Sequence, residues 1–173
     1  QSGGIDLSLA NKHIGAGLYF LTDKSGGGIF NKIEVMPTAS YSYIFGDNAL
    51  TLGGQFVYSM HQFDRSSLRF GVNENDFNQS ASYTDANVGL NFKRDFYYVI
   101  LNVGVSAAHL LTPPLKFSKS AVTNTKLPMY FKAYTTVDWE LTDRLKLSPG
   151  AYAGFQANST DVMAGTNLSY KFM

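Results

Sequence analysis

Apolar and polar residues alternate along most of the chain. Within Tyr83–Lys93 the apolar residues share one parity and the polar residues and glycine share the other: Ala86, Val88, Leu90 and Phe92 against Asp85, Asn87, Gly89 and Asn91. A β-strand directs successive side chains to opposite faces of its sheet. This run therefore predicts a strand with one apolar and one polar face.

The same alternation predicts strands over the rest of the chain, at Ile5–Leu9, Ile14–Leu21, Ile33–Phe45, Leu50–Gln62, Tyr97–Ala108, Met129–Leu141, Leu145–Asn158 and Val162–Phe172. Eight strands fall between Ile14 and Phe172, and Ile5–Leu9 makes nine. No stretch combines a 3.6-residue apolar period with helix-capping residues. No linker divides the chain, so we expect residues 1–173 to form one all-β domain, an antiparallel meander.

An alternating all-β chain is either a soluble sandwich or a barrel in a membrane. On the apolar parity of the predicted strands there is no Asp, Glu, Lys or Arg, whereas the polar parity is rich in Gly, Ser, Thr, Asn and Tyr. Charged residues make up 16% of the chain and aromatic residues 14%. A solvent-exposed sheet face usually carries more charge, because soluble domains average roughly 25% charged residues. The polar parity is therefore typical of a barrel lumen and the apolar parity of a face in contact with lipid.

The joints between the predicted strands also favour a membrane barrel. Short joints lie near Asn11–His13, Gly46–Asn48, Arg94–Asp95 and Thr142–Arg144, and long joints at Lys24–Lys32, Asp64–Ser82 and Leu111–Lys126. Outer-membrane barrels have tight turns on the periplasmic side and longer loops outside, with aromatic girdles near the strand ends. We therefore expect a transmembrane β-barrel in the bacterial outer membrane. The eight strands from Ile14 to Phe172 could form a complete small barrel, whereas nine strands, an odd number for such a barrel, would suggest part of a larger one.

No apolar stretch is long enough for a transmembrane helix, and no basic segment followed by an apolar one opens the chain as a signal peptide would. The formal net charge is +1, which is too weak to attract nucleic acid, and there is no cysteine. The three histidines, His13, His61 and His109, have no ligand-type partner at i+2 or i+4, so we expect no metal site and no cofactor.

Two groups of residues could carry chemistry on the polar parity. Ser59 and His61 share a face two residues apart, which permits a serine–histidine contact but lacks the sharp turn of a hydrolase nucleophile. The charged residues of the polar parity are better explained as a salt-bridge network in the lumen than as an acid–base pair. Its predicted members are Asp85, Lys93, Lys132, Asp138, Glu140 and Lys146. We therefore expect no enzymatic activity.

The two longest joints are the candidate contacts for a protein partner. Asp64–Ser82 mixes charged residues with exposed aromatics, and Leu111–Lys126 is stiffened at its entry by Pro113 and Pro114. The candidate contact residues are Arg65, Arg69, Phe70, Glu74, Asp76, Phe77, Leu115 and Phe117. The alternative for both joints is a solvated loop packed over the mouth of the barrel.

Several segments, in order along the chain, resemble the PorP/SprF family of outer-membrane proteins from Bacteroidota. They are Ile14–Gly26 (with Thr22 and Ser25 departing from the family pattern), Asp85–Gly89, Phe96–Tyr98, Ser106–Pro113, Leu127–Tyr130 and Leu145–Gly150. Family members open with a segment around an N-P-A-Y-A-G motif that this sequence lacks. The resemblance therefore suggests an internal or trimmed portion of a longer protein.

The resemblance implies a component of the type IX secretion or gliding machinery. On that basis we expect a scaffold or anchor for other secretion-system proteins or for a secreted surface adhesin. The runner-up hypothesis is a small passive porin or structural barrel, and a membrane hydrolase comes third. A conductance measurement separates a pore from a filled barrel.

Overall fold

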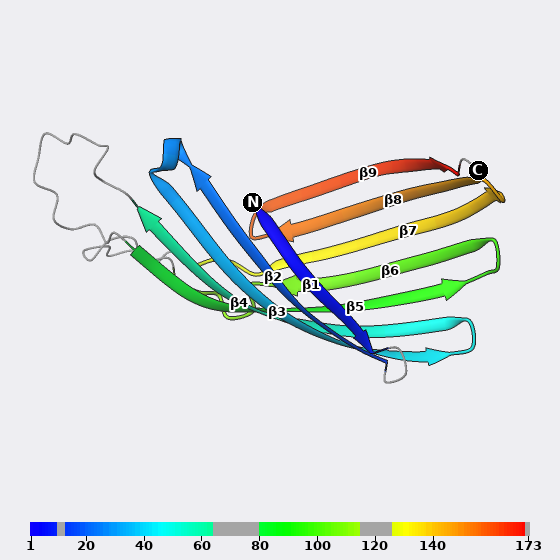
Figure 1. Ribbon diagram of the computed structural model, residues 1–173, viewed down its shortest axis with the longest axis horizontal. Helices are drawn as coiled ribbons and strands as arrows, with labels where there is room; N and C mark the ends of the chain where they lie inside the picture. Colours follow the sequence, from blue (N-terminus) through cyan, green and yellow to red (C-terminus); the bar gives the residue numbers. More distant parts are fainter. Residues whose placement is uncertain (10–12, 64–79, 115–125, 172–173) are drawn as a thin grey trace, which may run out of the picture.

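The protein folds as one curved β-sheet (Figure 1). The computed structural model describes residues 1–9, 13–63, 80–114 and 126–171. Its strands are β1 (Ser2–Leu9), β2 (Ile14–Ser25), β3 (Phe30–Phe45), β4 (Asn48–Phe63), β5 (Ser80–Asp95), β6 (Val99–Ala108), β7 (Tyr130–Thr142), β8 (Leu145–Gln156) and β9 (Ser159–Tyr170). A turn of 3-10 helix, η2 (Gly26–Gly28), joins β2 to β3. No helix in the described ranges is long and apolar enough to cross a membrane.

The strands pair in chain order, from β1 through to β9, and each runs antiparallel to the next. The predicted all-β antiparallel meander is therefore confirmed. β1 and β9 stand at the two ends of this order. No pairing joins them within the described residues, so the sheet is open there.

The two faces of the sheet differ in polarity as the alternation predicts. One cross-strand row runs through Ser40, Gly53, Gly89 and Ser106. The next row runs through Tyr41, Leu52, Leu90 and Val105 and lies on the opposite face. We call the face of the first row the inner face and that of the second row the outer face.

Burial is the reverse of that in a soluble protein. The described residues classed as buried are Val57, Ser59, Asp85, Gly104, Pro113 and Gly154, most of them polar or small. Large apolar side chains on the outer face are exposed, including Leu52 (56%), Phe131 (52%) and Leu168 (62%). In water this arrangement would leave most of the apolar surface unburied. It suits a sheet whose outer face contacts lipid, and it agrees with the predicted barrel location.

Tyrosine side chains lie over glycines on the inner face. A Cβ atom added at Gly104 would collide with the ring of Tyr134, and one added at Gly4 would collide with the ring of Tyr19. Glycine therefore leaves room for a ring from the neighbouring strand to lie flat on the sheet. These rings fill part of the inner face, and the Tyr19 hydroxyl also donates to the Asp6 carboxylate at 2.6 Å.

Several predicted boundaries are wrong. In the last hairpin, the strand predicted to end at Asn158 ends at Gln156, and the strand predicted to begin at Val162 begins at Ser159. Lys24–Lys32 is not a long joint, because β2 continues to Ser25 and β3 begins at Phe30. The chain turns sharply at Gly26, Gly27 and Gly28, whose φ angles of 61°, 69° and 96° are accessible to glycine at little cost. Tyr97 is not in a strand either: it lies in the turn between β5 and β6 with φ 73°.

Some strands extend beyond their neighbours at one end of the sheet, which we call the projecting end. β4 and β5 have 16 residues each, whereas β6 has 10. β5 pairs with β4 as far as Ser80, but with β6 only as far as Val88. Figure 1 shows β2 to β5 reaching beyond the neighbouring ends of β6 to β9. This end is formed by the connections that follow β2, β4 and β6.

Candidate functional site: the inner face and the projecting end

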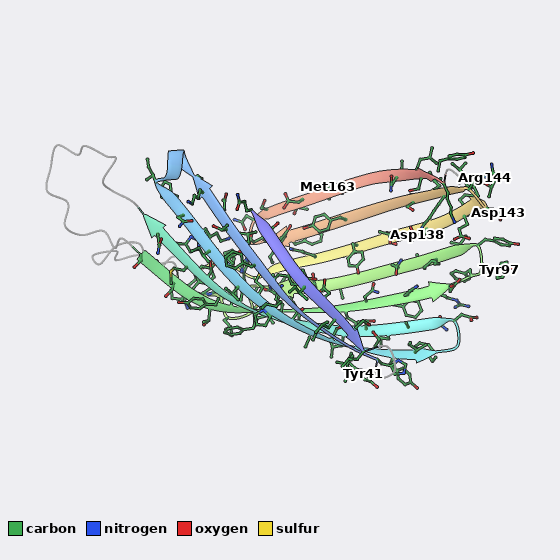
Figure 2. The ribbon with its side chains drawn as sticks, in the orientation of Figure 1. Tyr41, Tyr97, Asp138, Asp143, Arg144 and Met163 are labelled. Carbon is green, nitrogen blue, oxygen red and sulfur yellow. The ribbon has the colours of Figure 1, made fainter. Side chains whose placement is uncertain are left out.

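The predicted lumen network is divided along the sheet. At the end with the short turns, Lys146 Nζ lies 3.1 Å from Asp138 Oδ2, and Ser148 Oγ donates to Asp138 Oδ1 at 2.7 Å. Lys93 adds positive charge near Asp138. Glu140 lies opposite Lys146 in the register of β7 and β8. Figure 2 shows Asp138 on β7 a short way from the rim that carries Asp143 and Arg144.

Lys132 and Asp85 lie apart from that group. Lys132 is in the middle of β7, opposite Ser106 and Gly154, and its ammonium group sits 4.7 Å from the centre of the Tyr130 ring. Asp85 lies on β5 opposite Val57, near the projecting end. The predicted lumen residues therefore form separate groups of contacts at three levels along the strands, not one network.

Asp85 fixes the turn that follows β6. Its carboxylate is 1% exposed and contacts His109 Nδ1 at 2.6 Å. The other carboxylate oxygen accepts from the backbone N–H of Ala86 at 2.8 Å and of Leu111 at 3.3 Å. A buried carboxylate needs such partners, because leaving it unpaired costs several kcal/mol.

Neighbouring contacts hold the same turn. Asn87 Oδ1 accepts from the His109 backbone N–H at 3.2 Å, and the Ala86 carbonyl accepts from the Leu110 N–H at 3.1 Å. His109 and Thr112 have φ angles of 59° and 41°, which are strained for residues with a Cβ. The strained turn is therefore held against β5 by a compact set of hydrogen bonds.

Ser59 and His61 do make contact on the inner face. Ser59 Oγ lies 3.1 Å from His61 Nε2, and the His61 ring stacks on Tyr83 with 5.6 Å between ring centres. Ser59 is 0% exposed, so no substrate carbonyl can reach its hydroxyl in this conformation. The Asp85 carboxylate lies opposite Val57 on β4 and contacts His109. The three residues therefore do not form the serine–histidine–acid chain of a hydrolase.

The predicted partner-contact residues lie outside the described residues. They are Arg65, Arg69, Phe70, Glu74, Asp76 and Phe77 in the joint between β4 and β5, and Leu115 and Phe117 in the joint between β6 and β7. The structure does describe where these joints leave the sheet. The first leaves β4 after Phe63 and enters β5 at Ser80. The second passes through a bridge between Pro114 and Lys126.

The opposite rim carries a cluster of aromatic side chains in the turn between β5 and β6. Tyr97 is 81% exposed, and its ring meets that of Tyr98 edge-on at 4.6 Å. The Arg94 guanidinium lies 4.7 Å from the centre of the Phe96 ring. Tyr97 lies at this rim in Figure 2. Amphipathic rings at a strand end are typical of the aromatic girdle of a membrane barrel.

The inner face is hollowed between β1 and β7. A cavity of about 730 Å³ is lined mainly by small and polar residues, among them Ser40, Gly53, Gln55 and Asn91. Among the described residues, no three His, Cys, Asp or Glu side chains are grouped so as to hold a metal ion.

The sequence indicated Asp85 as a lumen residue but did not reveal its contact with His109. These residues are 24 positions apart, and they meet because β6 ends at Ala108 and the chain folds back on β5. Pro113 and Pro114 were the one local signal that the strand ends nearby, since proline cannot continue a ladder.

A family model described as type IX secretion system membrane protein PorP/SprF matches residues 1–173. A search of curated proteins and a search of solved structures each found no match.

Proposed function

Because the chain belongs to the PorP/SprF family of type IX secretion system membrane proteins, we propose that it is a non-catalytic scaffold for that system. The protein is an outer-membrane component of the secretion machinery. The proposed role goes further: the barrel holds other secretion-system proteins, or a secreted surface protein, at its projecting end. The match of the family model over residues 1–173 carries this proposal.

The shape of the sheet supports a role for the projecting end. The joint between β4 and β5 and the joint between β6 and β7 both leave the sheet there. Hydrogen bonds from Asp85 and Asn87 fix the start of the second joint. We propose that a protein partner contacts the charged and aromatic residues predicted in these joints, such as Arg65 and Arg69. Gliding motility is a proposed setting for the same role.

We also propose that the nine strands are part of a larger barrel. Within the described residues, no further strand pairs with the far side of β1 or of β9, so backbone groups along these two edges lack a ladder partner. Lipid cannot hydrogen-bond such groups, so strands that span the membrane must form a closed structure. Additional strands between β9 and β1 would supply these bonds.

Purification of the full-length protein from its native outer membrane in mild detergent tests the scaffold role. We expect type IX secretion components or a large secreted protein to co-purify. The variant R65E/R69E should lose them, whereas R144E, at the opposite rim, should retain them. Recovery of the wild-type barrel alone, in several mild detergents, would contradict the proposal.

The cavity on the inner face favours a passive pore as the second candidate function. Its volume of about 730 Å³ and the polar groups among its small lining residues would suit water and small solutes. Single-channel recording of the full-length protein in a planar bilayer separates the two functions. Steady conductance together with the absence of co-purifying proteins would favour the pore.

A further inference from the structure

One edge of β5 is unpaired where the strand runs beyond β6. The Asp95 N–H bonds to Asp47 on the β4 side, whereas the Ala86 carbonyl bonds to Leu110 on the β6 side. Backbone groups of alternate residues in a strand point to opposite edges. The N–H and C=O groups of Ser80, Ser82 and Thr84 therefore point toward the β6 side, but the ladder between β5 and β6 ends at Val88.

The paired part of this edge ends at Ala86. Its carbonyl accepts from Leu110, and its N–H donates to the Asp85 carboxylate. Beyond it, the backbone groups of Thr84, Ser82 and Ser80 on this edge have no partner among the described residues. Their odd-numbered neighbours remain paired with β4.

The opposing wall cannot complete the ladder. A cavity of about 530 Å³ separates Ser80–Thr84 from Leu111, Pro113 and Pro114. Proline has no backbone N–H, so the two prolines cannot donate to the free carbonyls. The bonds from Asp85 and Asn87 to the turn keep this wall in place. The result is a slot with a strand edge on one side and an apolar wall on the other.

The slot has the features of a receptor for an extended chain. Free strand edges in water are usually blocked by lysine, proline or a bulge. Ser80–Thr84 contains neither proline nor any charged residue. The outer-face residues Ser80, Ser82 and Thr84 are polar, whereas Val88 and Leu90 further along β5 are apolar. This edge therefore lies beyond the apolar band, where a partner can approach through water.

We propose that the edge of β5 at Ser80–Thr84 binds an extended, uncharged segment of a partner polypeptide by β-strand addition. Main-chain hydrogen bonds to Ser82 and Thr84 supply the affinity, and Leu111 and Pro113 favour apolar side chains on one face of the segment. At about 3.3 Å per residue, the edge accommodates a segment of about five residues. This inference deepens the proposed function. It rests on that function in one respect, namely that the partner is a secretion-system protein or a secreted protein.

The test uses a tethered probe peptide with the sequence Lys-Thr-Val-Thr-Val-Thr-Val-Thr-Lys. Residues 1–173 contain no cysteine. K126C therefore offers a single attachment point near the slot, in a full-length background where any cysteine outside these residues is replaced by serine. A flexible linker raises the local probe concentration to the millimolar range, which makes even weak binding detectable. The matched probe has the same side chains with every core amide N-methylated.

Amide hydrogen exchange, resolved by NMR in detergent micelles, is the measurement. Without a probe, Ser82 and Thr84 should exchange rapidly while Ala81 and Tyr83 exchange slowly. The tethered probe should slow Ser82 and Thr84 at least tenfold, and the N-methylated probe should not. S82P, which removes one free N–H, should also abolish the slowing at Thr84, and S82A should retain it.

Three results would overturn the proposal. Slow exchange at Ser82 and Thr84 before the probe is attached would mean that the chain itself, or a second copy, already covers the edge. Unchanged exchange with the probe, or equal slowing by the N-methylated probe, would exclude strand addition. Co-purification separates this inference from the scaffold role. If the slot fails these tests but the protein still co-purifies with its partners, strand addition is excluded and the scaffold role is retained.

Discussion

Removal of the Asp85 carboxylate should release the turn that follows β6. Asp85→Ala deletes a charge-assisted hydrogen bond to His109 and the acceptor for the Leu111 N–H. A bond to a charged group contributes about 1.5–3 kcal/mol and an ordinary one about 1 kcal/mol. The turn also carries backbone strain at His109 and Thr112, which favours opening once these bonds are lost.

We therefore expect the free energy of opening this turn to fall by about 2–4 kcal/mol, which raises exchange of the Leu111 amide by about 30- to 1,000-fold. Hydrogen exchange with mass spectrometry on the peptide covering residues 109–113 measures the change. Asp143→Ala, at the opposite rim, is the control and should leave this peptide unchanged.

A change of less than threefold at Leu111 in Asp85→Ala would refute the reasoning. An equal acceleration in all strands would also refute it, because the substitution would then weaken the whole barrel rather than the turn. The double variant D85A/H109A sharpens the test. If the two side chains act through one bond, the change in opening free energy in the double variant should be smaller than the sum of the changes in the two single variants.

Three further predictions concern the packing and the surroundings of the sheet, and two of them have a matched control substitution. Gly104→Ala should lower the free energy of unfolding by about 1–3 kcal/mol, because the added methyl group meets a tyrosine ring, whereas Gly165→Ala has open space and should change little. Urea unfolding in lipid vesicles measures both. Leu52→Arg, on the outer face, should cost about 2–4 kcal/mol and reduce membrane assembly, whereas Thr51→Arg, on the inner face, should assemble nearly as wild type. Lys146→Met should cost less than about 1 kcal/mol in the same unfolding assay, because the ion pair that it breaks is partly exposed to solvent.

The packing of tyrosine rings over glycines on the inner face is hard to read from the sequence. The tyrosines and glycines are visible as polar-parity residues, but Tyr134 covers Gly104 only because the register of β6 and β7 places them opposite each other. A change of register by one residue would move every side chain to the other face. Register between strands is therefore the information that local patterns lack.

The candidate site was likewise predictable only in part. Alternation placed Asp85, Asp138 and Lys146 on the polar face, because side-chain direction in a strand depends only on parity. It could not show that Asp138 contacts Lys146 while Asp85 contacts His109, since these contacts depend on where neighbouring strands end. The free edge of β5 is a second example, because it exists only through the difference in length between β5 and β6.

The all-β class, the polarity of each face and the type of environment could be predicted from local patterns, because they depend on a two-residue period that is present in every strand. The family resemblance was likewise visible in local segments, and the family model bears it out. Four features became visible only in the folded protein: the register, the short turn at Gly26–Gly28, the buried partner of Asp85 and the slot beside Ser80–Thr84. Apart from the local glycine turn, each of these arises from contacts between residues far apart in the chain, where the energy of pairing and packing outweighs local preference.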